Sequence, residues 1–123
     1  MRVFLKYQFP LVGYAALVFA ISSIPQISAP DLGIDWIDKI AHGVEYLLFF
    51  LIALRAFRNK PFRLKAGVLI TLTATISLVY AISDEIHQYY VPGRSADILD
   101  ILADMVGILA GMTVYFFWIR TGD

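Results

Sequence analysis

Four long apolar runs, separated by short polar or charged stretches, dominate the pattern of this chain. A helix needs roughly 20 apolar residues to cross the hydrocarbon core of a bilayer, and each run is about that long. The pattern therefore predicts an all-α fold, an integral membrane bundle of four transmembrane helices in a single domain that comprises residues 1–123. The predicted helices are about residues 8–25, 36–57, 66–88 and 96–119.

The first run has a second interpretation. Basic residues precede it, and small residues such as Ser22 and Ser23 follow its apolar part, as in a signal peptide. A retained transmembrane helix is the interpretation that we favour, because the uncharged stretch 7–30 is long enough to span a bilayer.

Polar side chains mark one face and one end of each of the other three predicted helices. At 100° per residue they form stripes that leave the remaining faces apolar. On the second helix the stripe is Asp38, His42 and Glu45, with Tyr46 beside it. On the third helix it is Thr73, Ser77, Tyr80, Asp84, His87 and Gln88, and Glu85 lies outside it. On the fourth helix it is Asp97, Asp100 and Asp104, continued by Gly107 and Gly111.

Two local signals concern the fourth helix. Ser95 is a suitable N-cap, and Asp97 would then lie in the first turn, where a carboxylate suits the helix dipole. Gly107 and Gly111 form a GxxxG pair, which allows a neighbouring helix to approach closely. We therefore expect these two glycines to serve helix packing.

The composition fits a membrane protein and excludes several kinds of site. The chain is 59% hydrophobic, with a mean hydropathy of +0.72, which is too apolar for an ordinary soluble domain of this length. It has no cysteine, so disulfides, thiolate metal ligands and cysteine nucleophiles are excluded. The formal net charge is zero, so nothing indicates nucleic acid as a partner. The lipid bilayer is the expected partner, and the oligomeric state stays open.

Charges of opposite sign are segregated along the chain, and this predicts an orientation. Eight of the ten lysines and arginines lie on the side that holds both termini and the loop 55–65. By the positive-inside rule this side is cytoplasmic, so both termini are expected inside the cell. Nine of the ten acidic residues and both histidines lie toward the other side. The three polar stripes should therefore meet at the extracytoplasmic end of the bundle.

Two of the carboxylates are predicted to lie well inside the membrane. Glu45 and Asp104 are about 10 Å along their helices from the first acidic residue of each stripe, at 1.5 Å per residue. An ionised carboxylate that faced lipid at this depth would cost several kcal/mol. We therefore expect each of them to face the bundle interior and to be protonated, paired or hydrated.

Three kinds of chemistry are open to the polar set. Carboxylates and imidazoles can ligate a divalent cation, although the spacing here matches no known metal motif. The candidate ligands are Asp38, His42, Asp84, Glu85, His87 and Asp100. The same groups can perform general acid–base catalysis, with His42 beside Glu45 as the candidate base. The candidate catalytic residues are His42, Asp84, Glu85 and Asp100. A network of ion pairs that only orients the helices is the third interpretation, so the sequence leaves both an enzymatic activity and a cofactor open.

Lys39 and Arg94 are the two basic residues on the acidic side. A guanidinium at this position can bind the phosphate or carboxylate of a lipid-linked or peptide ligand. We favour an ion pair of Arg94 with Asp97, Asp100 or Asp84, because acidic neighbours outnumber it. Lys39 is expected to pair with Asp35 or Asp38, or to extend to the membrane interface.

Two motifs combine these polar positions. The first is Asp38-Lys39-x-x-His42-x-x-x-Tyr46. The second is Asp84-Glu85-x-x-Gln88-x-x-x-Pro92-x-Arg94, followed by Asp100, Gly107 and Gly111. In spacing and order the chain resembles the VanZ-like family of small bacterial membrane proteins over residues 38–111. It differs at Asp104, where the family usually has Asn, which donates hydrogen bonds as well as accepting them.

The resemblance implies a function in the cell envelope, since the family is named after a protein associated with teicoplanin resistance. We expect a polar pocket on the extracytoplasmic side that binds a lipid headgroup, a lipid-linked ligand or a glycopeptide, and so modulates glycopeptide sensitivity. The expected ligand-binding residues are Asp38, Lys39, His42, Tyr46, Asp84, Glu85, Gln88, Arg94, Asp100 and Asp104. The alternative is a membrane-embedded hydrolase or transferase that acts on a lipid-linked substrate. A transporter is disfavoured, because the strong polar groups do not continue to the cytoplasmic side.

Overall fold

The computed structural model describes residues 1–25, 35–59 and 63–119. These residues form a bundle of long helices without a strand. The helices are α1 (Phe9–Ser22), preceded by the π-helical turn η1 (Phe4–Gln8), then α2 (Asp35–Arg58), α3 (Ala66–Tyr89) and α4 (Ile98–Val114), followed by the π-helical turn η2 (Tyr115–Ile119). Within these described ranges, four helical stretches are long and apolar enough to cross a membrane. They are Phe4–Ser22, Trp36–Arg58, Ala66–Tyr89 and Ile98–Trp118. The predicted all-α membrane bundle is confirmed.

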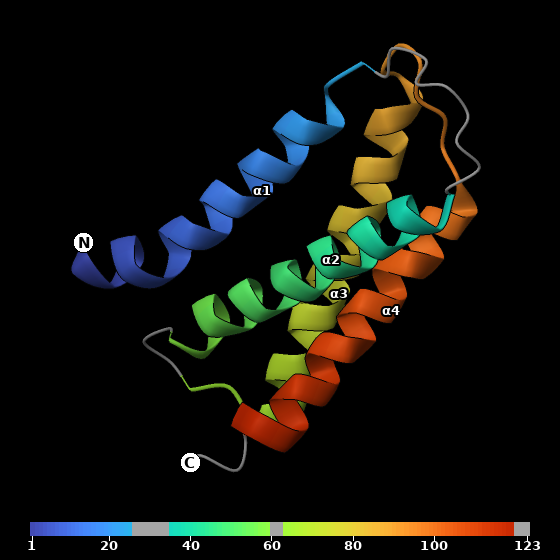
Figure 1. Ribbon diagram of the computed structural model, residues 1–123. Helices are drawn as coiled ribbons and strands as arrows, with labels where there is room; N and C mark the ends of the chain where they lie inside the picture. Colours follow the sequence, from blue (N-terminus) through green and yellow to red (C-terminus); the bar gives the residue numbers. More distant parts are fainter. Residues whose placement is uncertain (26–34, 60–62, 120–123) are drawn as a thin grey trace.

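The polar ends of the helices lie together at one end of the bundle. Figure 1 shows the C-terminal ends of α1 and α3 beside the N-terminal ends of α2 and α4. The chain passes from one end to the other in each helix, so α2 and α4 run in the same direction. The side chains that sequence reasoning assigned to a site are therefore at one end, as an up-and-down topology requires.

The first helix begins earlier than the pattern indicated. Helical structure starts at Phe4 and ends at Ser22, whereas the sequence indicated about 8–25. Pro10 lies in the first turn of α1, and it has no backbone N–H to donate to the preceding turn. The π-helical turn η1 directly precedes α1. It extends the helical structure toward the N-terminus, beyond the proline.

The fourth helix begins at Ile98, and its N-cap is Asp97 rather than the predicted Ser95. Asp97 has extended backbone angles (φ −129°, ψ 121°), and its carboxylate accepts a hydrogen bond from the Leu99 N–H at 2.9 Å. Asp is as good a cap as Ser. Asp97 is in addition held by Lys39 from α2, a tertiary contact that the local sequence does not show.

The closest helix contact joins α2 to α4 through glycine. A Cβ added at Gly107 would overlap the carbonyl oxygen of Gly43 and would lie 2.9 Å from its carbonyl carbon. One turn further along, a Cβ at Gly111 would lie 2.6 Å from Cδ1 of the Phe50 ring. The two glycines thus let the backbone of α4 approach α2. The apolar core below this contact is built mainly from α2, with Tyr46, Phe49, Phe50 and Leu54.

The first helix is held to the bundle by few side chains. Val18 and Ser22 are its buried residues. The Tyr14 hydroxyl donates to the Glu45 carbonyl at 2.9 Å, and the Tyr80 hydroxyl donates to the Ala15 carbonyl at 2.5 Å. Tyr14 therefore joins α1 to the backbone of α2, and Tyr80 joins α3 to the backbone of α1. Most of the apolar surface of α1 faces outward.

Candidate functional site

Lys39 connects the N-terminal ends of α2 and α4. Its ammonium donates hydrogen bonds to Asp97 Oδ2 at 2.8 Å and to Asp100 Oδ1, and it lies 3.7 Å from Asp38 Oδ2. Hydrogen bonds from Lys39 and from the Leu99 N–H hold the pKa of the Asp97 carboxyl below its usual range. The sequence predicted pairing with Asp35 or Asp38, and the side chain of Asp35 lies outside the described residues. The two pairs to α4 are the larger part of the cluster, and the sequence did not predict them.

His42 lies between two carboxylates of α4. Its Nδ1 is 3.0 Å from Asp104 Oδ1, and its Nε2 is 3.8 Å from Asp100 Oδ2. His42 is 7% exposed and Asp104 is 1% exposed, so this pair is closed off from the surroundings. A carboxylate only accepts hydrogen bonds, so a proton between Nδ1 and Asp104 is required. The imidazole therefore has both nitrogens directed at acids.

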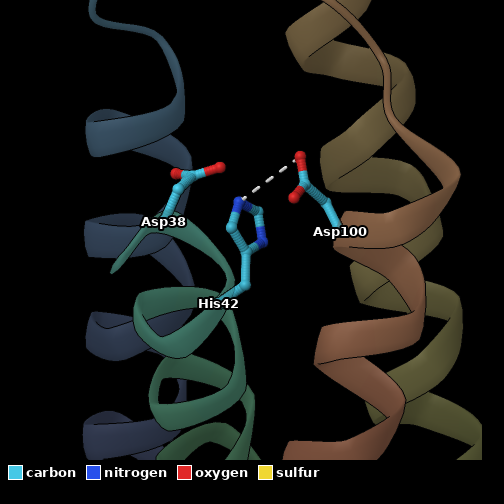
Figure 2. Close-up of side chains that lie close together, drawn as sticks. All are labelled: Asp38, His42 and Asp100. Carbon is cyan, nitrogen blue, oxygen red and sulfur yellow. Dashed lines mark ion pairs between the residues drawn. The ribbon is translucent and has the colours of Figure 1, made fainter. Parts of the chain in front are cut away.

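One group of side chains in the described part of the chain has the geometry of a metal site. One ligand atom from each of Asp38, His42 and Asp100 lies within 4.8 Å of the others, and Figure 2 shows the three side chains converging from α2 and α4. The Lys39 ammonium already contacts both carboxylates. It supplies positive charge where a cation would bind, so a metal ion would have to displace it. These residues therefore fit an ion-pair cluster better than a divalent cation.

The remaining predicted metal ligands lie elsewhere. Asp84 belongs to a second polar group on α3. His87 Nε2 lies 2.9 Å from Ser23 Oγ at the end of α1, and Phe19 stacks on its ring with 4.4 Å between centroids. Ser23 Oγ also donates to the Phe19 carbonyl at 2.7 Å. His87 therefore joins α3 to α1, a role that the sequence did not predict.

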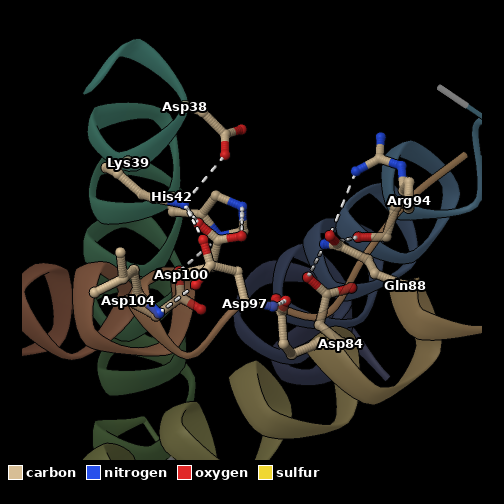
Figure 3. A network of polar contacts seen from close by, with 12 residues as sticks. Asp38, Lys39, His42, Asp84, Gln88, Arg94, Asp97, Asp100 and Asp104 are labelled. Carbon is tan, nitrogen blue, oxygen red and sulfur yellow. Dashed lines mark hydrogen bonds and ion pairs between the residues drawn. The ribbon is translucent and has the colours of Figure 1, made fainter. Parts of the chain in front are cut away.

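The second polar group joins α3 to α1 around Gln88. Its side-chain amide donates to Asp84 Oδ2 at 3.2 Å and to Ser22 Oγ at 3.4 Å, and its oxygen accepts from Arg94 at 3.5 Å. Asp84 and Gln88 are both buried. Figure 3 shows this group beside the group that contains Lys39 and His42. The structure therefore divides the predicted site into two hydrogen-bonded groups at the same end of the bundle.

Arg94 binds backbone carbonyls rather than the acids predicted for it. Its guanidinium donates to the carbonyls of Ile24 at 2.9 Å and Ile21 at 3.2 Å. No ion pair of Arg94 with Asp84, Asp97 or Asp100 occurs in the structure as described. The last carbonyls of a helix have no partner within it and attract cations. Arg94 thus caps the C-terminal end of α1. The acidic side chains bind Lys39, His42 and Gln88 instead.

Two predicted site residues have polar atoms that are buried without a partner. The Tyr46 hydroxyl, on a side chain that is 0% exposed, has no hydrogen bond among the described residues. Glu85 accepts from the Asp97 N–H at 2.5 Å through Oε1, and its Oε2 has no partner among the described residues. Such atoms mark places where a water or a ligand group completes the hydrogen bonding.

These features define a class. Helices that can cross the membrane, short connections and a buried polar cluster at one end make this a multi-pass α-helical membrane protein. A family profile described as VanZ/LLP1 matches residues 3–119, and the chain belongs to this family. The family resemblance of its polar motifs is thereby confirmed. Searches with the chain found no significant match among curated proteins or among solved structures.

Proposed function

We propose that this VanZ/LLP1 family protein acts at the outer face of the bacterial cytoplasmic membrane. There its buried polar end binds a lipid headgroup or a lipid-linked envelope ligand, and this binding alters sensitivity to glycopeptides such as teicoplanin. The observation that carries the proposal is the Tyr46 hydroxyl, which is buried and has no hydrogen-bond partner among the described residues.

An unsatisfied buried hydroxyl costs about 1–3 kcal/mol. The bilayer core supplies no water to lower this cost. Tyr46 lies one turn after His42 on α2, so the two side chains are on the same face of this helix. A polar group of a bound molecule that enters between the helices would satisfy the hydroxyl and the carboxylates together. We therefore assign ligand binding to Tyr46 together with His42, Asp84 and Asp104.

Both signs of charge are available to such a ligand. Lys39 and Arg94 provide donors at the rim, where Asp38 is also exposed, and the acids provide acceptors deeper in the bundle. A headgroup that combines an anionic phosphate with hydrogen-bond donors is complementary to this arrangement. A purely apolar molecule would leave the Tyr46 hydroxyl without a hydrogen bond.

A hydrolase or transferase is the alternative, because the contact of His42 with Asp104 is the kind of pair that general acid–base catalysis uses. The candidate catalytic residues are His42, Asp84, Glu85 and Asp100. A general base needs a free lone pair directed at the substrate. Both nitrogens of His42 face acids, and this favours binding over catalysis.

Tyr46→Phe is expected to leave the protein as stable as the wild type or more stable, by about 1 kcal/mol, because it removes an unsatisfied buried hydroxyl and keeps the ring. The same change should remove ligand binding. Thermal unfolding of the purified protein gives the first result. The teicoplanin concentration that inhibits cells producing each variant gives the second.

Tyr115→Phe is the matched control, because Tyr115 is buried at the opposite end of the bundle. It should keep the wild-type effect on teicoplanin sensitivity. A Tyr46→Phe variant that folds and keeps the full effect would contradict the assignment of Tyr46. No difference between the wild type and an empty vector would contradict the glycopeptide part of the proposal.

The orientation has its own test in this cysteine-free chain. Ser95→Cys lies between α3 and α4, at the polar end, and Asn59→Cys follows α2 at the other end. We expect a membrane-impermeant thiol reagent added to intact cells to label the cysteine at position 95 and not the one at position 59. Labelling only at position 59 would reverse the topology, and it would place the polar cluster at the cytoplasmic face.

A further inference from the structure

A groove of about 340 Å³ lies on the outer side of the α3–α4 pair, at the polar end of the bundle. Its walls include Ile82, Ile86 and Tyr89 from α3 and Ile98 from α4. These four side chains are between 39% and 68% exposed. The groove therefore opens away from the core, toward the lipid that would surround the bundle. It is separate from the Tyr46 site, which lies inside the bundle.

The lining of the groove is mostly apolar, apart from two carboxylates and the hydroxyls of Tyr89 and Tyr90. Glu85 and Asp97 are the acidic residues among those that line it, and none of the lining residues is basic. Glu85 is 3% exposed, and its Oε2 is one of the buried atoms without a hydrogen-bond partner. Its other oxygen is taken by the backbone N–H of Asp97. The groove is therefore lined by a carboxylate whose second oxygen is buried and has no hydrogen-bond donor among the described residues.

No basic side chain among the described residues forms an ion pair or a hydrogen bond with Glu85. Lys39 contacts Asp97, but it is shared with Asp100 and Asp38. It donates no hydrogen bond to Glu85 in the described structure. A carboxylate in surroundings of low dielectric is stabilised by a nearby cation. A ligand with a positively charged donor would supply this cation from the groove side.

We propose that the groove binds one membrane lipid whose headgroup carries a primary ammonium. The ammonium lies at Glu85 and Asp97, and the upper part of an acyl chain lies against Ile82, Ile86 and Ile98. Tyr89 belongs at the depth of the headgroups, where tyrosines concentrate in membrane proteins. An anionic lipid without an amine has no ammonium to offset its phosphate, so its net negative charge would be repelled by the two carboxylates.

This site goes beyond the proposed function and does not depend on it. Glu85 was predicted to join His42 and Asp84, but the structure bonds it to the N-terminus of α4 at the groove. Tyr46→Phe should therefore leave lipid selection at the groove unchanged. Likewise, a groove that shows no lipid preference would not contradict ligand binding at Tyr46.

The test compares phosphatidylethanolamine with phosphatidylglycerol of the same acyl chains, bound to the purified protein and counted by native mass spectrometry. The wild type should retain phosphatidylethanolamine about tenfold better, the equivalent of about 1.4 kcal/mol. Glu85→Gln should bring the two lipids close to parity. Glu45→Gln, a carboxylate of α2 outside the groove, is the matched control and should keep the preference.

A steric pair of variants keeps the test valid if Glu85→Gln does not fold. Ala96 lines the groove, and Leu99 is on the same part of the chain but does not line it. Ala96→Trp should abolish the retention of phosphatidylethanolamine, whereas Leu99→Trp should preserve it. Equal binding of the two lipids by the wild type would overturn the proposal. An unchanged preference in folded Ala96→Trp or Glu85→Gln protein would overturn it as well.

Discussion

Gly107→Ala is expected to destabilise the protein by about 3 kcal/mol or more, at the upper end of what overpacking usually costs. The added methyl group would overlap the Gly43 carbonyl oxygen and would lie 3.0 Å from the Leu47 nitrogen. These are backbone atoms, which cannot rotate away as a side chain does. The helices would have to separate along the α2–α4 contact, which joins the two halves of the Lys39 and His42 cluster.

Three other glycines provide graded controls for this substitution. At Gly111 the methyl group would meet the Phe50 ring, which can shift, so Gly111→Ala should cost less than Gly107→Ala. At Gly13 and Gly67 nothing lies within 4 Å. Alanine at either position should be neutral or stabilising, because glycine is the weaker helix former. Chemical unfolding in detergent gives the order, and a Gly107→Ala variant as stable as Gly67→Ala would contradict the close contact.

Lys39→Ala should cost about 3 kcal/mol of unfolding free energy, in the range for removing one partner of a buried ion pair. The loss comes mainly from Asp100, whose side chain is only 8% exposed. Without Lys39 this buried carboxylate would lose its closest ion-pair partner. The Asp97 cap would also lose its contact to α2. Thermal and chemical unfolding of the purified variant measure the loss.

The double variant Lys39→Ala with Asp100→Asn should recover part of the loss, because the uncompensated carboxylate is then removed. Lys65→Ala is the control for the loss of a lysine, since Lys65 is exposed at the start of α3 and makes no side-chain cap. It should change the stability by less than about 0.5 kcal/mol. Equal losses for Lys39→Ala and Lys65→Ala would show that the cluster does not stabilise the fold.

The pairing between α2 and α4 could be predicted only in part from the sequence. The face of α4 that carries Asp100, Asp104, Gly107 and Gly111 could be identified from helical periodicity alone. Which helix that face meets could not, because a small-residue pair accepts any neighbour that approaches closely. Once Gly107 lies on Gly43, the parallel helices acquire a fixed register. That register pairs residues about 60 positions apart, 61 for Lys39 with Asp100 and 62 for His42 with Asp104.

Arg94 and Glu85 show a different limit. Counting acidic neighbours favoured an ion pair for Arg94, but the guanidinium reached the open carbonyls at the end of α1. Backbone acceptors at a helix end do not appear in a charge count. Glu85 lies outside the polar stripe of α3, and this was visible from periodicity. Its bond to the Asp97 N–H depends on how the turn after α3 brings α4 back.

The sequence by itself determined that the protein crosses the membrane with all-α helices and that its polar groups gather at one end. A helix in a bilayer must form its backbone hydrogen bonds within itself, and its charged side chains must avoid the lipid. Both conditions depend on short stretches of sequence, so they can be recognised without the tertiary structure. Only the tertiary structure determined which polar side chains form hydrogen bonds and ion pairs with one another. That depends on contacts between distant segments. Among the described residues, these contacts leave the Tyr46 hydroxyl and Glu85 Oε2 without hydrogen-bond partners.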